Sequence, residues 1–231
     1  MRTAFLTTDS RPKAYGAPGA LRNLAAVFAF LVLTACASAS PLKVVAFGDS
    51  LTQGYGLVER EGFVPQLQSW LSENLDEDVV VINAGVSGDT TAGGLARIGW
   101  ALGEGADAVI VELGGNDLLR GLDPAQTRAN LDGILAEITG RGVPVLLAGL
   151  TAPGNYGAEY KASFAAIFPD LAAKYGAILY PDFFAGLGDP GDASSMARYL
   201  QKDGIHPTAE GVRLIVMGIG PSVRELLARA R

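Results

Sequence analysis

The 231-residue sequence has only one cysteine and one histidine, and these two counts exclude several classes of protein. Cys36 alone cannot form a disulfide within the chain, and a zinc site built from cysteine and histidine needs more such residues than are present. A two-metal phosphoesterase is disfavoured as well, because His206 would be the only nitrogen ligand of the usual kind. We therefore expect no metal and no other cofactor.

The sequence also lacks a run of basic residues. Its formal net charge is -6, and four of the 18 basic residues but only one of the 24 acidic residues lie in the first 36 positions, so the rest of the chain is more acidic still. An acidic body would repel the phosphates of a nucleic acid. We expect no nucleic-acid partner, and a monomer that acts on a small molecule.

An apolar run long enough to span a membrane is missing too. Basic residues up to Arg22 precede the run Leu24–Leu33 and then small residues, which is the order of a secretory signal peptide. The run is shorter than the roughly 20 residues of a spanning helix. Cleavage after residue 39 would export a single domain of residues 40–231. The alternative is a bacterial lipobox, which Leu33–Cys36 resembles, and a lipid on Cys36 would then be the one membrane contact.

The remaining sequence alternates between short apolar runs and longer amphipathic segments. This alternation predicts a parallel sheet of five strands with helices on both faces, a three-layer α/β/α fold with right-handed crossovers. The expected strands cover residues 42–47, 79–84, 108–113, 143–149 and 177–180. The expected helices cover residues 63–74, a segment up to about 102, 123–140, a segment up to about 174, and about 208–228.

Ser50 lies just past the carboxyl end of the first expected strand, where open α/β sheets bind their ligands. Gly48 allows a tight turn there, and Asp49 and Ser50 are residues that can cap a helix. Two interpretations follow, a capped strand-to-helix corner or a nucleophile turn. Polar residues also follow the other expected strands, so all of these loops meet at one edge of the sheet.

A serine nucleophile needs a base, and the base needs a third group to orient it. His206 is the only histidine, and Asp203 precedes it by three residues in an expected loop. Pro207 disfavours a helical conformation at His206 and so favours an extended backbone. A surface histidine in a loop is the alternative if no nucleophile is present.

Attack on an acyl carbonyl also needs hydrogen-bond donors for the oxyanion. Three groups are candidates: the N–H of Ser50, the N–H of Gly85 and the side-chain amide of Asn116. Asn116 could instead be a residue that stabilises a turn. Asp49 and Asp117 are interpreted as acids that bond to the backbone of their own turns.

Four segments together resemble the sequence blocks of the SGNH, or GDSL-type, hydrolases, in the order of that family. They are Gly48–Leu51, Asn83–Asp89, Gly114–Asp117 and Asp203–Pro207, within a stretch from about Lys43 to Gly211. The resemblance implies a flavodoxin-like fold. It also implies that Ser50 is the nucleophile, that Gly85 and Asn116 are oxyanion donors, and that Asp203 and His206 complete a triad.

Three further segments resemble the bacterial arylesterase and acyl-CoA thioesterase I subgroup of this family. They are Val111–Gly121, Asn155–Gly157 and Phe164–Pro169. Members of the subgroup are periplasmic single-domain enzymes that hydrolyse thioesters, aryl esters and some lysophospholipids. The resemblance implies substrate contacts by three leucines, Leu118, Leu119 and Leu122, and by Asn155 and Tyr156. Ordinary packing under a loop is the alternative for the leucines.

We therefore expect a serine esterase or thioesterase that acts on small acyl esters through an acyl-enzyme. Two alternatives remain open at this stage. A carbohydrate acetyl esterase would use the same residues on a different substrate. An exported binding protein could use the same fold without catalysis.

Overall fold

The computed structural model of the chain describes residues 3, 40–103, 105–188 and 193–231. The predicted leader and Cys36 lie outside these residues, apart from residue 3. Within the described part, no helix is long and apolar enough to cross a membrane.

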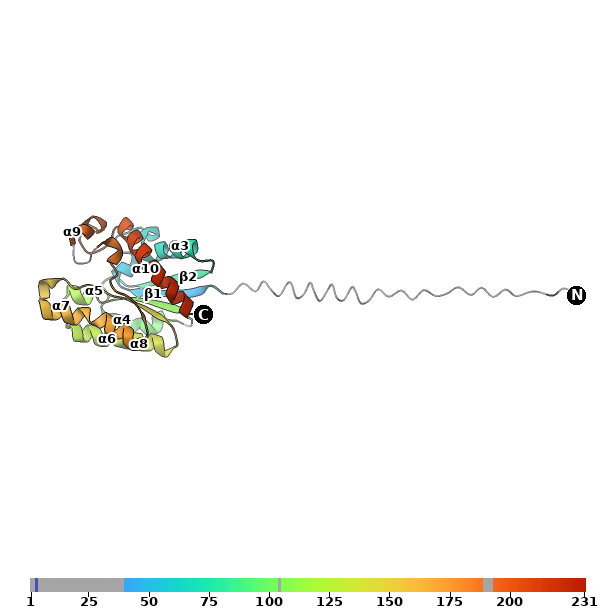
Figure 1. Cartoon of the computed structure of the whole chain (residues 1–231), viewed down its shortest axis with the longest axis horizontal. Helices are drawn as coiled ribbons and strands as arrows, with labels where there is room; N and C mark the ends of the chain where they lie inside the picture. The colour runs from blue at the N-terminus through green and yellow to red at the C-terminus, as the bar shows by residue number, and fades with distance from the viewer. Residues whose placement is uncertain (1–2, 4–39, 104, 189–192) are drawn as a thin grey trace. The chain divides into compact units, whose positions relative to one another are not determined.

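The predicted parallel sheet of five strands is confirmed, with the order β2-β1-β3-β4-β5 (Figure 1). The chain enters at β1, moves to β2 at one edge, and then returns past β1 to β3 and onward to β5. The connections therefore diverge between β1 and β3, and this is the point at which open α/β sheets form ligand sites. The strands are β1 (Leu42–Gly48), β2 (Val79–Gly85), β3 (Ala108–Glu112), β4 (Val145–Ala148) and β5 (Ile178–Tyr180).

Helices cover both faces of the sheet, which confirms the three-layer α/β/α arrangement. Helices α3 and α10 pack together on one side, and α4, α6 and α8 pack side by side on the other (Figure 1). The main helices are α3 (Phe63–Asn74), α4 (Thr91–Ala101), α6 (Pro124–Gly140), α7 (Ala158–Ala165), α8 (Ile167–Tyr175) and α10 (Ala209–Arg229). The short ones are α2 (Ser50–Gln53), α5 (Gly115–Leu119) and α9 (Ala193–Met196).

The predicted start of α6 shows how local sequence defines an element. The Asp123 carboxylate accepts a hydrogen bond from the N–H of Ala125, and Pro124 occupies the first turn, where its missing N–H costs nothing. The helix then buries an apolar face, and its end at Gly140 agrees with the prediction. Helix α10 likewise begins after the capping residue Thr208, and it continues through Pro221.

The helix predicted to run up to about residue 174 is two helices, so that prediction is wrong. Helix α7 ends at Ala165 and α8 begins at Ile167. Pro169 explains the break, because a proline has no N–H to donate to the carbonyl of Ala165, four residues earlier, and its ring collides with that carbonyl.

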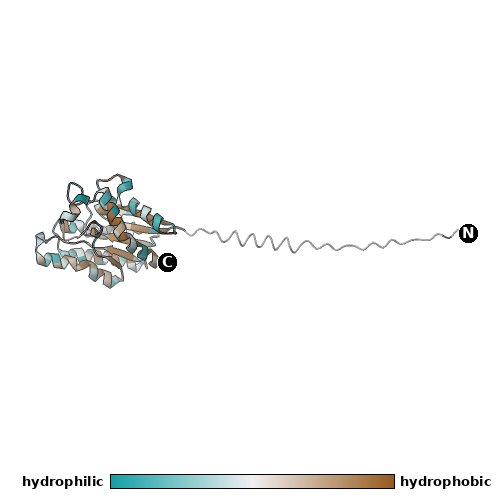
Figure 2. Cartoon of the chain, turned by 45° about the horizontal axis from the view of Figure 1, so that its top comes forward, coloured by the Kyte–Doolittle hydropathy of each residue, from teal (hydrophilic) through white to brown (hydrophobic). Residues whose placement is uncertain are grey.

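The core lies between the sheet and the two helix layers. Residues 44–48 of β1 and all of β3 are buried, as expected for strands that are covered on both faces. In Figure 2 the strands are mostly hydrophobic, whereas the outer helices mix both kinds of residue. Glu112, at the end of β3, is an ionisable residue within this buried layer.

Candidate active site

The turn after β1 presents Ser50 at the carboxyl edge of the sheet. The Asp49 carboxylate accepts a hydrogen bond from the N–H of Leu51 at 3.0 Å and thereby caps α2, whose first residue is Ser50. A side chain at Gly48 would lie only 2.6 Å from the main-chain oxygen of Glu112, so the turn requires glycine there. The turn therefore combines a capped corner with an oriented serine.

The structure brings Ser50, His206 and Asp203 into one hydrogen-bonded chain. The Ser50 Oγ lies 2.9 Å from His206 Nε2, and His206 Nδ1 lies 2.7 Å from Asp203 Oδ2. The other carboxylate oxygen of Asp203 accepts the N–H groups of Ile205 and His206. These hydrogen bonds, foremost the one from the His206 side chain, lower the pKa of Asp203 to about 2. Asp203 is therefore charged when it faces the imidazole.

The loop that carries His206 is held from two sides. Leu200 pairs with Pro207 in an antiparallel bridge, and the N–H of Gln201 donates to the carbonyl of His206 at 2.7 Å. On the other side, the ring of Tyr55 lies 4.5 Å from the imidazole, centroid to centroid. The first two contacts close the loop on itself, and the Tyr55 contact connects it to the segment after α2.

Asn116 lies beside the nucleophile turn and is held there by Asp49. The Asn116 Nδ2 group donates one hydrogen bond to Asp49 Oδ2 at 3.0 Å. Its second N–H makes no hydrogen bond within the described residues. Asp49 is 1% exposed, and this burial raises its pKa to about 6. The prediction that Asp49 bonds to its own turn is confirmed for one oxygen, but it missed the bond to Asn116.

The predicted role of Asp117 in its own turn is not what the structure shows. Its buried carboxylate accepts the N–H of Thr91 at 2.8 Å and the hydroxyl of the same residue at 2.5 Å, and it lies 3.3 Å from the hydroxyl of Thr127. Asp117 therefore connects α5 to the start of α4 and to α6. The distant partners of this side chain could not be read from its neighbours in the sequence.

Glu112 was missed by sequence reasoning. Its side chain is 0% exposed, and its Oε2 accepts the hydroxyl of Thr52 at 2.9 Å, whereas Oε1 has no partner within the described residues. Burial, together with the nearby carboxylate of Asp49, raises the pKa of Glu112 well above its ordinary value. The available signal was a charged residue inside the apolar run that predicted β3.

In the structure, Gly85 packs closely against the nucleophile turn, and its N–H already makes a hydrogen bond. That N–H donates to Asn83 Oδ1 at 3.0 Å, and a side chain at Gly85 would lie 2.9 Å from the main-chain oxygen of Asp49. Gly88 lies three residues further along the same loop with a left-handed φ of 79°. Its carbonyl accepts a hydrogen bond from Arg120, and its N–H makes none within the described residues. Gly88 thus offers the open N–H that we expected at Gly85.

An apolar cleft of about 480 Å³ adjoins the triad. Its lining includes Leu51 and Ile205, the neighbours of Ser50 and His206, and further residues from α5 and from the loops after β4 and β5. Of the predicted substrate contacts, Leu118 and Leu119 line this cleft. The remaining three, Leu122, Asn155 and Tyr156, are not among its lining residues.

Tyr156 does not line the cleft itself, but it is hydrogen-bonded to Leu119, which does. Its hydroxyl donates to the carbonyl of Leu119 at 3.2 Å, and the hydroxyl of Tyr160 donates to the carbonyl of Leu122 at 3.0 Å. The loop of residues 118–122 is therefore tied to α7 and to the turn before it.

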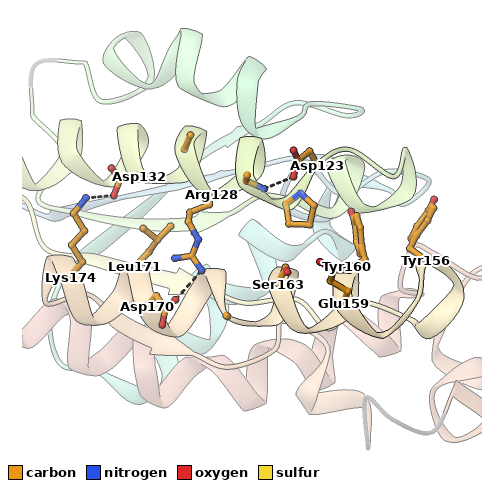
Figure 3. A pocket seen from close by; sticks show the side chains of 14 residues that line it. Asp123, Arg128, Asp132, Tyr156, Glu159, Tyr160, Ser163, Asp170, Leu171 and Lys174 are labelled. Carbon is orange, nitrogen blue, oxygen red and sulfur yellow. Dashed lines mark hydrogen bonds and ion pairs between the residues drawn. The ribbon is translucent and has the colours of Figure 1, made fainter.

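A larger groove of about 880 Å³ lies between α6 and the α7–α8 pair (Figure 3). Arg128 pairs with Asp170 at 2.9 Å and Lys174 pairs with Asp132 at 2.5 Å, so most of its charges neutralise one another. Neither the triad residues nor their neighbours in the chain line this groove, whereas Leu51 and Ile205, the neighbours of Ser50 and His206, line the smaller cleft. The smaller cleft beside Ser50 is therefore the candidate active site. Among the described residues, no group of three or more histidine, cysteine or acidic side chains is arranged to hold a metal ion.

Comparison with known proteins agrees with this geometry. The family model described as GDSL-like Lipase/Acylhydrolase matches residues 46–214. Esterase TesA of Pseudomonas aeruginosa is 38% identical over 205 residues, which cover 88% of this chain and 98% of the relative. Thioesterase 1/protease 1/lysophospholipase L1 of Escherichia coli is 34% identical over 201 residues, 87% of this chain and 92% of the relative. The crystal structure of AlinE4, an SGNH-hydrolase family esterase, aligns with a TM-score of 0.67 and 45% identity, over 82% of this chain and 98% of that one.

Proposed function

Since the chain belongs to the GDSL-like lipase/acylhydrolase family, we propose that it hydrolyses acyl esters and thioesters with Ser50 as nucleophile, His206 as base and Asp203 as the orienting acid. The chain is a carboxylic ester hydrolase, as are its relatives named esterase and thioesterase. The binding protein without catalysis is therefore set aside. The observation that supports these roles best is the 2.9 Å contact between Ser50 Oγ and His206 Nε2, continued by Asp203.

In the first half of the reaction, His206 Nε2 accepts the proton of Ser50 while Oγ attacks the carbonyl carbon of the substrate. The carbonyl oxygen becomes an oxyanion. When the tetrahedral intermediate collapses, the bond to the leaving oxygen or sulfur breaks, and His206 gives the proton to that atom. The alcohol or thiol departs and the acyl group stays on Ser50. Asp203 stabilises the imidazolium that exists between these steps.

In the second half, a water molecule takes the place of the leaving group. His206 accepts one of its protons while the water oxygen attacks the acyl carbon. The new tetrahedral intermediate then releases a carboxylic acid, and His206 returns the proton to Ser50 Oγ. The enzyme regains its starting state without a cofactor.

Three donors would stabilise the oxyanion in both halves. The N–H of Ser50 and the second N–H of Asn116 are two of them, and neither makes a hydrogen bond within the described residues. Gly85 could join only by giving up its bond to Asn83 Oδ1. We therefore propose the open N–H of Gly88 as the third donor in place of Gly85. Losing one such donor typically costs about 10²- to 10³-fold in rate.

The cleft beside Ser50 supports an acyl chain as the group that is bound. Its lining is largely apolar, with Leu118 and Leu119 on its wall, and such a surface favours hydrocarbon over the hydroxyl groups of a sugar. In this proposal Tyr156 supports Leu119 from behind, and Leu122 shapes the loop rather than contacting substrate. Within the described part of the chain, no hydrogen bond or ion pair of Asn155 supports a role in binding.

The leader suggests where the enzyme works. The order of basic, apolar and small residues before position 40 supports export and a periplasmic location. A lipid on Cys36 would tether the same domain to a membrane surface. A single catalytic domain of residues 40–231, acting as a monomer, completes the proposal.

The first prediction tests the triad. Ser50→Ala and His206→Ala should each lower turnover of p-nitrophenyl butyrate by about 10⁴- to 10⁶-fold, because either change removes the nucleophile or its base. Ser69→Ala is the matched control, since Ser69 is exposed on α3 and its hydroxyl donates to the carbonyl of Pro65 in the same helix. Near wild-type turnover in either triad variant would contradict the mechanism, as would labelling of Ser50→Ala by a fluorophosphonate probe.

A substrate panel separates the acyl hydrolase from the carbohydrate acetyl esterase. Acyl-CoA thioesters, aryl esters of increasing chain length, and acetylated sugars are compared at equal enzyme concentration. Hydrolysis of medium-chain esters supports the acyl cleft. Activity confined to acetyl-sugars would assign the same triad to the other substrate class.

A further inference from the structure

Arg97 lies on α4, outside the triad, and its guanidinium bonds to the loops that carry the proposed catalytic groups. Its Nη2 donates to the carbonyl of Gly48 at 2.9 Å, and its Nη1 donates to the carbonyl of Ala84 at 2.8 Å. Its Nε lies 2.7 Å from the carboxylate of Asp89, in an ion pair whose arginine side chain is 20% exposed. The guanidinium carbon also lies 4.1 Å from the centre of the Phe47 ring. All three guanidinium nitrogens therefore have defined partners.

These partners belong to the ends of two neighbouring strands and to the loop after one of them. Gly48 is two residues before Ser50, at the end of β1. Ala84 is near the end of β2, and Asp89 follows Gly88 directly in the loop after that strand. One planar group thus connects the nucleophile turn to the loop that carries the proposed third oxyanion donor. A planar guanidinium with several fixed donors suits this task, whereas a lysine ammonium does not.

Two other hydrogen bonds join the loop after β2 to the nucleophile turn and to α2, and one of them runs from the Ser87 hydroxyl to the side-chain oxygen of Gln53 at 3.0 Å. The N–H of Val86 donates to the carbonyl of Gly48 at 3.0 Å, so this oxygen accepts both Val86 and Arg97. The N–H of Asp89 donates to the carbonyl of Val86 at 3.1 Å and closes the turn that contains Gly88. Arg97 contacts Asp89 at one end of this turn directly, and it is linked to Val86 at the other end through the shared carbonyl of Gly48. Arg120 bonds to the carbonyl of Gly88 between them.

Gly93 makes room for the ion pair. It lies within α4, where glycine is a poor helix former, yet a side chain at this position would collide with the carboxylate of Asp89. The glycine thus leaves the space in which Asp89 meets Arg97.

We propose that Arg97 is a positioning residue that sets the distance between Ser50 and the oxyanion donor of the loop after β2. This inference rests on the proposed function. Arg97 is not among the residues that line the cleft, so it does not touch the acyl chain. Its contribution should therefore act on the transition state, in which the oxyanion exists, and leave the binding of ground-state substrate unchanged.

The second prediction measures this contribution in the full-length protein with Arg97→Ala and Arg97→Lys. For p-nitrophenyl butyrate, kcat per active site, counted by fluorophosphonate titration, should fall about 10²-fold in Arg97→Ala with KM unchanged, because a misplaced donor can cost that much. Arg97→Lys should lose less, since it keeps the charge but not the three directed bonds. Added guanidinium should restore part of the activity of Arg97→Ala.

The second readout uses a boronic acid that forms a tetrahedral adduct with Ser50. If Arg97 only stabilised the fold, its substitution would not change how tightly the folded enzyme binds this boronic acid. Its affinity should fall by the same factor as kcat/KM across the variants. Arg141→Ala is the matched control, because Arg141 also reaches α4, at the carbonyl of Gly99, but lies away from the active site. That control should keep the wild-type kcat and the wild-type boronate affinity.

Gly93→Ala tests the inference without altering Arg97. Alanine favours the helix but displaces the carboxylate of Asp89, so kcat should fall while the melting temperature does not. If Arg97→Ala does not fold, Gly93→Ala still tests the inference. The inference is overturned if Arg97→Lys and Gly93→Ala keep the wild-type kcat per active site, or if boronate affinity stays constant while kcat falls.

The proposed function and this inference fail in different ways. Activity in Ser50→Ala would remove the proposed function, whatever the Arg97 variants do. An inactive Ser50→Ala together with fully active Arg97 variants would remove only the positioning role.

Discussion

Two aspartates lie at the candidate active site, and their pKa values are shifted in opposite directions. Asp203 has a side chain that is 36% exposed, and the hydrogen bond from His206 leads the causes that lower its pKa to about 2. Asp49 is 1% exposed, and burial raises its pKa to about 6 even though Leu51 and Asn116 donate hydrogen bonds to it. The same residue type thus has two electrostatic environments within one site.

The opposite pKa shifts indicate different roles for the two aspartates. Asp203 acts through its negative charge, whereas Asp49 acts by holding neighbouring groups in position. Asp203 faces the imidazole, where a negative charge stabilises the imidazolium of the intermediate steps. Asp49 points into the protein, where its two oxygens fix the start of α2 and the amide of Asn116. Beside it, burial also disfavours the charged form of Glu112 and raises its pKa. Substitutions to the neutral amide should therefore have unequal effects at these three carboxyl groups.

The largest effect should come from Asp203→Asn. We expect kcat for p-nitrophenyl butyrate to fall about 10⁴-fold, because an amide cannot replace the charge next to His206 and favours the wrong tautomer of the ring. Asp170→Asn, which changes an exposed acid paired with Arg128, is the control and should be silent. A loss of less than about tenfold in Asp203→Asn would show that the charge of Asp203 is not needed.

Asp49→Asn should have an intermediate effect, a loss of about 10²-fold in kcat with a folded protein. Asparagine caps helices as well as aspartate does, so α2 keeps its start. However, one of the two acceptor oxygens becomes an NH₂ group, and the bond that orients Asn116 is lost.

Asp123→Asn is the matched control for Asp49→Asn, because Asp123 caps α6 in the same way and lies outside the cleft. It should leave kcat unchanged. If both variants have wild-type kcat, the orientation of Asn116 does not depend on Asp49.

Glu112→Gln should have the smallest effect on turnover and a visible effect on stability. The raised pKa means that the folded state binds more protons than the unfolded state above pH 4.5, so the wild type loses stability as the pH rises through this range. The glutamine side chain at this position does not titrate. Its free energy of unfolding should therefore exceed that of the wild type by a margin that grows with pH, by up to about 1.4 kcal/mol per pH unit.

Urea unfolding of both proteins at several pH values between about 5 and 8 measures this margin. Glu137→Gln, at an exposed residue that pairs with Arg141, is the control and should show a margin that does not grow with pH. Parallel curves for Glu112→Gln and the wild type would mean that Glu112 is not held in its neutral form by the fold.

Local sequence was sufficient for most of the architecture. The apolar runs predicted all five strands within about two residues, which is the usual uncertainty of element ends. Helix α3 was predicted with its observed bounds. The helix that was predicted as one piece and is two contains Pro169, whose missing N–H is a local signal that the prediction did not use.

The sequence predicted the residues of the candidate active site better than it predicted their hydrogen-bond partners. Ser50, Asp203, His206 and Asn116 were selected from the sequence. The structure places the first three in one chain of hydrogen bonds, and it bonds Asn116 to Asp49, the residue that precedes Ser50. Their catalytic roles remain predictions for the experiments above. Gly85 was selected as an oxyanion donor, but whether its N–H is free depends on the orientation of the Asn83 side chain, which the sequence does not reveal.

The sequence by itself determined the order of strands and helices, the family to which its four blocks belong, and the single histidine that could serve as a base. Only the tertiary structure decided what Asp49, Asp117, Glu112 and Arg97 do. The reason is that their partners lie far along the chain, for example 67 residues away for Asp49 and Asn116, and 49 residues away for Arg97 and Gly48. The conformational preferences of neighbouring residues specify each turn. The electric field and the hydrogen bonds at a buried carboxylate, however, come from distant segments that folding brings around it.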